Sequence, residues 1–348
     1  MINVGIIGCG KIAQVRHIPE YAENPNCKIV GLFDLNTDRA KELAETYGAK
    51  AYDSIEALLA DENIHAVSIC TSNATHASIT IDALNAGKDV LCEKPMAITL
   101  EECEAMVEAA KKNRKKLMIG QNQRLAKAHE VAKEIVSSGK LGKVLTFRTA
   151  FGHGGPETWS VDPGKNTWFF DKKKAAMGAM ADLGIHKTDL IQYLLGSKVV
   201  SVQAVLTTLD KKGADDKLIS VDDNAICIYT MDNGSIGTMS ASWTYYGQED
   251  NSTILYGTNG ILRLYDNPEH TVQWIHTDGT LENIEADAIQ TNDNQTKSGI
   301  IDLFISCLIE DKEPEISGES VLSAMRAVFA SIQSSESGQK VNIEKNRG

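Results

Sequence analysis

The sequence feature that most constrains the fold lies at the start of the chain. An apolar strand pattern, Asn3 to Ile7, runs directly into Gly8-Cys9-Gly10-Lys11-Ile12-Ala13. This is the G-x-G-x-x-A form of the dinucleotide-binding fingerprint: the first glycine permits a tight turn, the second lets a pyrophosphate approach the backbone, and Ala13 allows close helix packing. A helix beginning here would point its unsatisfied amides at the phosphates. Glycines at strand ends are often only turns, so the motif depends on its context.

An acidic residue supplies part of that context. A second apolar run, Lys28 to Phe33, ends in Asp34, about 20 residues beyond the glycines, where the fingerprint expects an acid to bind a ribose 2′-hydroxyl. Because a carboxylate there would repel a 2′-phosphate, we predict NAD as the cofactor. Two alternatives stay open: Asp34 starts a turn and caps the next helix, Asp38 to Tyr47, and Arg39 leaves some tolerance for NADP.

Strand and helix patterns then alternate up to residue 120. Asp53-x-x-Glu56 resembles a capping box, and Thr99-x-x-Glu102 predicts another before a helix ending near Asn113. The further runs predict strands at Ala66–Cys70, Val90–Lys94 and Lys116–Gly120 and a helix at His76–Ala86. Strands separated by helices of this length imply right-handed parallel crossovers, so we predict an α/β fold with a doubly wound parallel sheet.

Ligands of such a sheet lie across the carboxyl ends of the strands, where the strand order reverses. Beyond the glycines and Asp34, these ends carry Thr71-Ser72-Asn73, Glu93-Lys94-Pro95 and Gln121 to Arg124. An isolated Glu-Lys-Pro could simply end a strand in solvent, but here Lys94 would stand beside the nicotinamide half of a cofactor. We predict cofactor contacts from Gly8, Gly10, Lys11, Ile12, Asp34, Arg39, Thr71, Asn73, His76, Glu93, Lys94 and Gln123.

The pattern changes after Arg124, where strands are joined by turns. One helix, Lys127 to Ser138, precedes them, and two helical patterns close the chain, Lys297 to Glu310 and Glu319 to Ser334. Turns at Asp232–Gly234 and Gly257–Gly260 predict hairpins. The strand-like runs are Lys143–Phe151, Val199–Thr208, Ala225–Met231, Ser235–Trp243, Thr253–Tyr256, Ile261–Tyr265 and Thr271–His276. They predict a second, α+β domain whose mainly antiparallel sheet has one face open to a partner.

Two segments interrupt these strands. Gly152 to Lys174 carries aromatic residues that suit the C–H surface of a sugar, which indicates either a substrate lid or a hydrophobic plug that anchors a long loop. These residues are Trp159, Trp168, Phe169 and Phe170. Met180 to Gly196 reads as a helix that places Asp182, His186, Asp189 and Tyr193 along one stripe. Every amphipathic helix has a polar face, so the stripe alone does not make a site.

Composition narrows the classes of function. The 348 residues suit about two domains, and a net charge of −12 gives no attraction for nucleic acid or anionic lipid. We see no signal segment and no apolar run of the roughly 18 residues that a membrane span needs, so we expect a cytoplasmic protein. Seven cysteines and eight histidines show no metal-ligand spacing, which predicts buried free thiols and no metal site.

Taken together, the motifs indicate one protein family. Gly8-x-Gly10-x-x-Ala13, Asp34, Thr71-Ser72-Asn73 with His76, Glu93-Lys94-Pro95 and Asp182-x-x-x-His186 follow the order seen in the glucose–fructose oxidoreductase, inositol dehydrogenase and rhizopine-catabolism (Gfo/Idh/MocA) oxidoreductase family. The chain resembles this family over essentially its whole length. The resemblance implies an NAD(P)-binding Rossmann domain at 1–122, a substrate-binding and oligomerisation domain at 123–348, and a homodimer or homotetramer formed through the C-terminal sheet.

The same resemblance implies dehydrogenation of a sugar or cyclitol hydroxyl. Lys94 would orient substrate and nicotinamide, Asp182 would bind a substrate hydroxyl, and His186 would be the general acid/base, with Arg124 and Trp168 also at the substrate. An imidazole with an ordinary pKa near 6.5 suits that proton transfer. The charges of Lys187 and Asp189 beside His186 depart from the family pattern. The alternatives are an NAD-dependent glycosidase of the same fold and a non-catalytic cofactor-binding sensor or corepressor.

Overall fold

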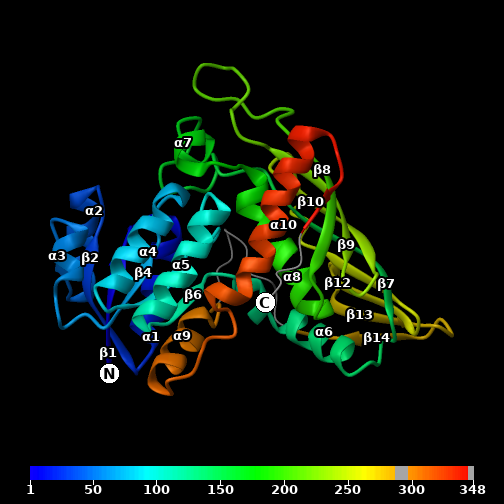
Figure 1. Ribbon diagram of the computed structural model, residues 1–348, viewed down its shortest axis with the longest axis horizontal. Helices are drawn as coiled ribbons and strands as arrows, with labels where there is room; N and C mark the ends of the chain where they lie inside the picture. Colours follow the sequence, from blue (N-terminus) through cyan, green and yellow to red (C-terminus); the bar gives the residue numbers. More distant parts are fainter. Residues whose placement is uncertain (287–296, 344–348) are drawn as a thin grey trace. The chain divides into compact units, whose positions relative to one another are not determined.

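Parallel strands form the N-terminal sheet, in the order β3-β2-β1-β4-β5-β6 (Figure 1). The computed structural model describes residues 1–286 and 297–343. The strands are β1 (Ile2–Ile7), β2 (Cys27–Phe33), β3 (Lys50–Ala51), β4 (Ala66–Ile69), β5 (Asp89–Cys92) and β6 (Leu117–Ile119), and each neighbouring pair is parallel. The order reverses between β1 and β4, so the predicted doubly wound sheet is confirmed.

Short polar side chains cap three of the five crossover helices of residues 1–122. These helices are α1 (Ile18–Glu23), α2 (Thr37–Tyr47), α3 (Ile55–Leu59), α4 (His76–Asn85) and α5 (Leu100–Asn113). Thr99 accepts a hydrogen bond from Glu102 N, as predicted. The capping prediction at Asp53 was wrong: Ser54 is the cap of α3 and accepts from Ala57 N. Asn36 caps α2, so the Asp34 carboxylate is not the cap of that helix.

The helix after the glycine loop starts with a π-helical turn, Ala13–His17, before α1 continues it. Pro19 lies in the first turn of α1. Proline has no N–H to donate and its ring crowds the preceding turn, so a widened turn just before it removes a conflict that a regular α-helix would have. The wider turn leaves the side chains of Arg16 and His17 buried.

The described residues 297–322 group with residues 1–122, whereas the sequence analysis placed everything after 122 in one C-terminal domain. The helix α9 (Ile300–Ile309) packs on α1 (Figure 1), and Asn24 donates to Asp302. Ile119 N donates to Ile316 O at 3.0 Å, so this segment also extends the hydrogen bonding of β6. The reason is burial: Ile301, Phe304 and Ile305 of α9 are at most 1% exposed.

Nine strands form the second sheet, in the order β14-β13-β12-β11-β7-β10-β9-β8-β15. They are β7 (Val144–Gly152), β8 (Val199–Thr207), β9 (Asn224–Met231), β10 (Ile236–Ser242), β11 (Thr253–Gly257), β12 (Gly260–Asn267), β13 (His270–His276), β14 (Leu281–Ile284) and β15 (Val341–Asn342). All pairings are antiparallel except that of β7 with β10, so the prediction of a mainly antiparallel sheet is confirmed.

The two faces of this sheet differ. Helices α6 (Lys127–Ser137) and α8 (Ile185–Leu195) contact strands on one face, and the end of α10 (Gly318–Ser337) bonds to β8 through Ser334. Residues alternate along β9: Cys227 and Tyr229 are fully buried, whereas Ile226 and Ile228 are 60% and 51% exposed. The second face therefore presents apolar side chains, from β8 to β10, that the described chain does not cover.

All seven cysteines are buried and free, as predicted. No helix within the described residues is long and apolar enough to span a membrane. Across residues 1–286 and 297–343, no group of three or more His, Cys, Asp and Glu side chains is arranged to hold a metal ion.

Candidate active site

The two glycines of the fingerprint are required for different reasons. Gly8 has a φ of 92°, and a Cβ there would lie 2.7 Å from the carbonyl carbon and oxygen of Cys70. A Cβ at Gly10 would meet only Cys70 O, at 4.0 Å. The protein itself therefore excludes a side chain at Gly8 but tolerates one at Gly10. Since the fold does not require glycine at position 10, the missing side chain of Gly10 fits the close approach of a pyrophosphate.

Asp34 connects the end of β2 to the glycine loop. Its Oδ2 accepts a hydrogen bond of 2.7 Å from Cys9 N, and its Oδ1 accepts one of 2.7 Å from Asn36 N. The carboxylate is half-buried and keeps lone pairs on both oxygens for a ribose hydroxyl. Asp34 therefore takes part in a turn, one of the two interpretations of the sequence, and its position also suits the other. Lys11, Ile12 and Arg39 are half-buried near the starts of the two adjoining helices.

The loop after β4 is fixed to the loop after β5 by a buried histidine. His76 is 1% exposed, and its Nδ1 and Nε2 lie 2.8 Å from Pro95 O and 3.1 Å from Thr71 O. Burial lowers the pKa of His76, against the two carbonyls, which raise it. The ring that we predicted to contact cofactor thus bridges two strand ends. Thr71 is half-buried and accepts from Thr75 Oγ1, and Asn73 is 6% exposed.

Beneath Lys94 lies a buried polar group that the sequence analysis did not identify. His17 Nε2 is 2.8 Å from Glu93 Oε1, and its Nδ1 is 3.2 Å from Ser68 Oγ. Burial alone would raise the pKa of Glu93, but the hydrogen bond and charge of His17, with Arg16 and Lys94, lower it to about 2. The Glu93 carboxylate also accepts from Lys94 N at 3.1 Å. It therefore holds the turn that carries Lys94 from inside the fold.

Lys94 is half-buried and lies just after Glu93, the first residue beyond β5, at the same edge of the sheet as the glycine loop. The Lys94–Pro95 peptide bond is cis. The edge thus gathers the carboxyl ends of β1, β2, β4 and β5, which is the position where doubly wound sheets bind ligands.

In the second unit, the parallel pair β7 and β10 ends at one edge, with Gly152 opposite Ser242. His153 N donates to Ser242 O, so the two segments stay paired beyond the ends of β7 and β10. The neighbouring aromatic residues are Phe151 and Trp243, which are 9% and 0% exposed. The parallel pairing, which the sequence analysis did not predict, is what brings these two residues to one edge.

Asp182 and His186 each contact one of those aromatic residues. Trp243 Nε1 donates to Asp182 Oδ2 at 3.0 Å, and the rings of His186 and Phe151 have centroids 6.0 Å apart. Asp182 lies in a π-helical turn, Met180–Gly184, that leads into α8. The Asp222 carboxylate accepts from Gly178 N and Met180 N and so caps that turn. Asp182 and His186 are 7% and 6% exposed.

The predicted polar stripe of this helix does not face solvent. Every residue from Ile185 to Gln192 is buried, and the other charged residues of this helix, Lys187 and Asp189, have partners of their own. Arg124 Nε and Nη2 donate to the two carboxylate oxygens of Asp189 at 2.7 and 2.5 Å, and Lys187 Nζ donates to Asn251 O at 2.9 Å. Arg124, predicted at the substrate, is thus bound to α8. Gln123, predicted at the cofactor, donates to Asn251 Oδ1.

The aromatic residues of Gly152 to Lys174 form a cluster on Trp243. Trp168 stacks on Phe169 at 3.9 Å between centroids, and Phe169 and Phe170 contact Trp243 at 6.4 and 6.0 Å. Trp159 meets Phe169 edge-on at 5.1 Å. Trp243, which the sequence analysis treated only as a strand end, is therefore the residue that connects this segment to Asp182. No spacing in the sequence marks that contact, because it joins residues 61 positions apart.

Comparisons with known proteins cover both units. Residues 2–121 match a family model described as an oxidoreductase family with an NAD-binding Rossmann fold, and residues 129–263 match the GFO/IDH/MocA C-terminal domain. A levoglucosan dehydrogenase of Pseudarthrobacter phenanthrenivorans is 32% identical over 291 residues, which cover 75% of this chain and 73% of the relative. A myo-inositol 2-dehydrogenase of Thermotoga maritima is 26% identical over 348 residues, 99% of each chain.

Solved structures agree on the fold. An oxidoreductase domain protein from Kribbella flavida has a TM-score of 0.87 at 25% identity, covering 99% of this chain and 100% of its own. An aldose-aldose oxidoreductase from Caulobacter crescentus, complexed with glycerol, has a TM-score of 0.84 at 25% identity, covering 98% and 99%.

Proposed function

The chain belongs to the Gfo/Idh/MocA oxidoreductase family, with an NAD-binding Rossmann fold, and we propose that it is a dehydrogenase acting on a hydroxyl-bearing carbon of a sugar, sugar derivative or cyclitol. The observation that carries this proposal is the pair of strand edges: one bears Gly10, Asp34 and Lys94, and the other bears residues in contact with Asp182 and His186. The names of the relatives, levoglucosan dehydrogenase and myo-inositol 2-dehydrogenase, support the substrate class.

The cofactor would be held mainly by backbone. Gly8 and Gly10 leave room for the pyrophosphate, with Lys11 and Ile12 at the adjoining helix start, and Asp34 would accept from ribose hydroxyls. Thr71 and Asn73 follow the next strand of the same edge. When bound, NAD would supply the nicotinamide carbon that takes the hydride from the substrate.

Three side chains would serve the substrate. Lys94 would donate to the reacting hydroxyl oxygen, and Asp182, already fixed by Trp243, would accept from a neighbouring hydroxyl. His186 would accept the proton that the reacting hydroxyl loses as its carbon gives up hydride, because an imidazole is suited to take a proton near neutral pH. Trp168 would add an aromatic face to the sugar.

The second unit would also form the contact between subunits. Val205, Ile226, Ile228 and Ile236 are 49% to 63% exposed on adjacent strands of one sheet face. A contiguous apolar surface of this kind is typical of an interface. We assign it to a homodimer or homotetramer.

The test is a panel of polyols, aldoses and keto sugars, read for reduction of NAD and of NADP or oxidation of their reduced forms. Reduced cofactor should accumulate with at least one polyol or sugar. A glycosidase would release aglycone without net NADH, and a sensor would bind NAD and leave the panel blank, so each alternative has its own result.

The residue assignment is tested by Lys94→Ala and His186→Ala. Each should lower kcat roughly 100-fold or more, as expected for loss of a positioned acid/base or charge, and should change the pH profile. His65→Ala, at the amino end of β4, is the control and should retain activity. Near wild-type turnover with a wild-type pH profile in either variant would overturn the assignment.

A further inference from the structure

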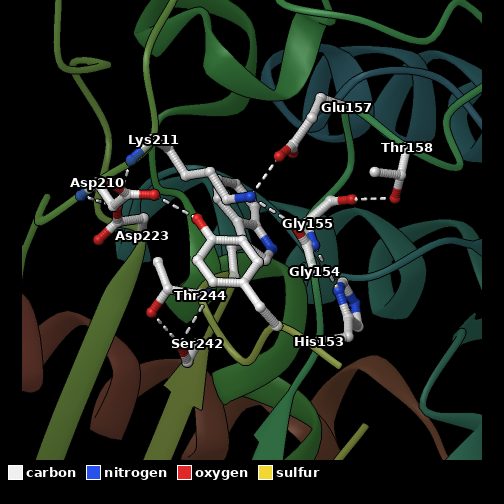
Figure 2. Close-up of polar contacts among 12 residues, drawn as sticks. His153, Gly154, Gly155, Glu157, Thr158, Asp210, Lys211, Asp223, Ser242 and Thr244 are labelled. Atoms are coloured by element: carbon white, nitrogen blue, oxygen red, sulfur yellow. Dashed lines mark hydrogen bonds and ion pairs between the residues drawn. The ribbon is translucent and has the colours of Figure 1, made fainter. Parts of the chain in front are cut away.

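The segment Gly152 to Lys174 is fixed by a buried lysine. Lys211 is 5% exposed, and its Nζ donates to Gly154 O and to the Glu157 carboxylate. The same Nζ lies 4.8 Å from the centroid of the Tyr246 ring. Figure 2 shows the Lys211 side chain reaching between Glu157 and the backbone of Gly154 and Gly155. A segment held in this way is anchored from inside rather than free to open as a lid.

Lys211 is itself held in place by Asp223. The Asp223 carboxylate is fully buried and accepts hydrogen bonds of 2.8 to 2.9 Å from the backbone amides of Leu209, Asp210 and Lys211. Figure 2 shows Asp210 and Asp223 beside the backbone of Lys211. Because three successive amides donate to one carboxylate, the backbone that carries the Lys211 side chain forms a rigid turn.

The backbone at Gly155 is adapted to this contact. Its φ is 101°, and a Cβ there would lie 2.6 Å from Glu157 Oε2 and 3.0 Å from the Lys211 side chain. Glycine is thus required both for the conformation and for the close approach of the ion pair.

Aromatic contacts connect the anchored stretch to the proposed catalytic residues. The His153 ring meets Trp159 at 6.0 Å and Phe151 at 5.8 Å between centroids, and Phe151 meets His186. Trp159 also meets Phe169, which contacts Trp243, the donor to Asp182. A shift of residues 153–159 would therefore be transmitted to both Asp182 and His186 within this unit.

Two polar atoms of the anchored stretch fit a polyol. Trp159 Nε1 and Glu157 Oε2 are buried and have no hydrogen-bond partner among residues 1–286 and 297–343. Buried polar atoms are nearly always satisfied. A hydroxyl group can accept from an indole N–H or donate to a carboxylate oxygen, so sugar or cyclitol hydroxyls match both atoms.

We propose that Lys211 is a positioning residue that fixes Gly152 to Lys174 as the substrate-recognition wall, and that Trp159 on this wall binds a hydroxyl of the substrate. The inference rests on the proposed function for its substrate class. Lys211 touches no reacting atom and acts through Gly154, Glu157 and the aromatic contacts.

The chain offers a matched control. Lys165 pairs with Asp216 and joins the same two segments, but these side chains are 53% and 76% exposed. Exposed ion pairs contribute little to holding a structure, whereas removing one partner of a buried pair leaves an uncompensated charge. Asp216→Asn removes this exposed pair from outside the segment. It should therefore behave as wild type in every measurement in which Lys211→Met does not.

The first experiment measures KM and kcat on a substrate from the panel, together with NADH affinity by fluorescence titration. Lys211→Met should raise the substrate KM roughly tenfold or more, as a displaced recognition wall predicts, with kcat less affected and NADH affinity unchanged. Lys211→Arg should restore most of the affinity. Trp159→Phe, which keeps a ring and loses the N–H, should raise KM with kcat nearly unchanged. An unchanged KM in Lys211→Met or Trp159→Phe would overturn the corresponding part of the proposal. If Lys211→Met raises KM, lowers kcat and weakens NADH binding by similar factors, the role of Lys211 is merely structural.

The second experiment needs no substrate, so it separates this proposal from the proposed function. Limited trypsin digestion of the full chain is followed by mass spectrometry for cleavage after Lys172, Lys173 and Lys174. Cleavage should be roughly tenfold faster in Lys211→Met than in Asp216→Asn, because a segment without its anchor opens more often. Equal rates would show that Lys211 does not anchor the segment, whatever the sugar panel gives.

Discussion

The Asp34 carboxylate accepts a hydrogen bond of 2.7 Å from the backbone amide of Cys9, inside the glycine loop. The residue that we assign to the ribose therefore also holds the loop that we assign to the pyrophosphate. A substitution must separate charge from hydrogen bonding to show which of the two matters for cofactor choice.

Asp34→Asn comes nearest to that separation: its amide oxygen can still accept from Cys9 N, while the negative charge and the acceptor for Asn36 N are lost. We expect kcat/KM with NAD to fall and that with NADP to rise, each roughly tenfold, since a hydrogen bond to a charged group contributes about 1.5–3 kcal/mol. Asp38→Asn, exposed on α2, is the control. Steady-state kinetics with both cofactors measure the ratio, and an unchanged ratio would contradict the assignment of Asp34.

The two glycines should respond differently to the same change. Gly8→Ala places a Cβ 2.7 Å from the Cys70 carbonyl at a φ of 92°, so we expect a loss of about 2–4 kcal/mol in the free energy of unfolding from strain and overpacking. Gly10→Ala should leave stability unchanged and weaken NAD binding roughly tenfold or more. Urea denaturation and NADH titration of both variants check this pair. Equal loss of stability in the two would show that Gly10 serves the fold.

Glu93 should stabilise the protein in a defined range of pH. Its pKa is lowered from 4.5 to about 2, which corresponds to about 3 kcal/mol. Because the folded pKa is depressed, this stabilisation is fully present above about pH 4.5 and is lost as the pH falls toward 2. Glu93→Gln should therefore be less stable than wild type at pH 6, with the difference shrinking toward pH 3. Urea denaturation at several pH values measures it, and Glu108→Gln, exposed on α5, should show no such trend.

Lys187 has the opposite effect. It is fully buried, and burial lowers its pKa from 10.5 to about 7, against the charges of Asp250 and Glu249, which raise it. The folded state binds this proton less well than the unfolded state, so the cost is full below about pH 7 and disappears as the pH approaches 10.5. Lys187→Met should raise the free energy of unfolding by about 1–4 kcal/mol at pH 6, and by less at pH 9. A gain that does not depend on pH would contradict burial of the charge, and exposed Lys172→Met is the control.

The open face of the second sheet should be an interface between copies of the chain. Ile226→Asp with Ile228→Asp should weaken association by at least about 2 kcal/mol, roughly thirtyfold in Kd. Both side chains are more than half exposed in the single chain, so the monomer should stay folded. Sedimentation equilibrium measures the change. Leu218→Asp is the control, because Leu218 is 51% exposed away from these strands. If the wild-type protein sediments as a monomer, the assignment of this face to an interface is wrong.

Short-range patterns made much of the fold predictable. The glycines after β1, the acid after β2 and the alternation of strands with helices depend on residues that are near one another in sequence, and each predicted element of the first 120 residues is present within a few residues. The strands missed were β3 and β15, which have two residues each, and β14, which has four; runs this short carry little or no pattern. The return of residues 297–322 to the first unit could not be predicted, because nothing local distinguishes a helix that packs on α1 from one that packs elsewhere.

The sequence by itself determined the fold class, the cofactor edge and the residues worth testing, because backbone geometry and hydrophobic periodicity are local properties. Only the tertiary structure decided what those residues touch. It turned His76 and Glu93 toward the protein interior, paired Arg124 with Asp189, and brought Trp243 to Asp182 and Lys211 to Glu157. These contacts join positions up to 76 residues apart, and a buried charge or polar group takes whichever partner the packed chain brings within reach, since leaving it unpaired costs more than any local preference.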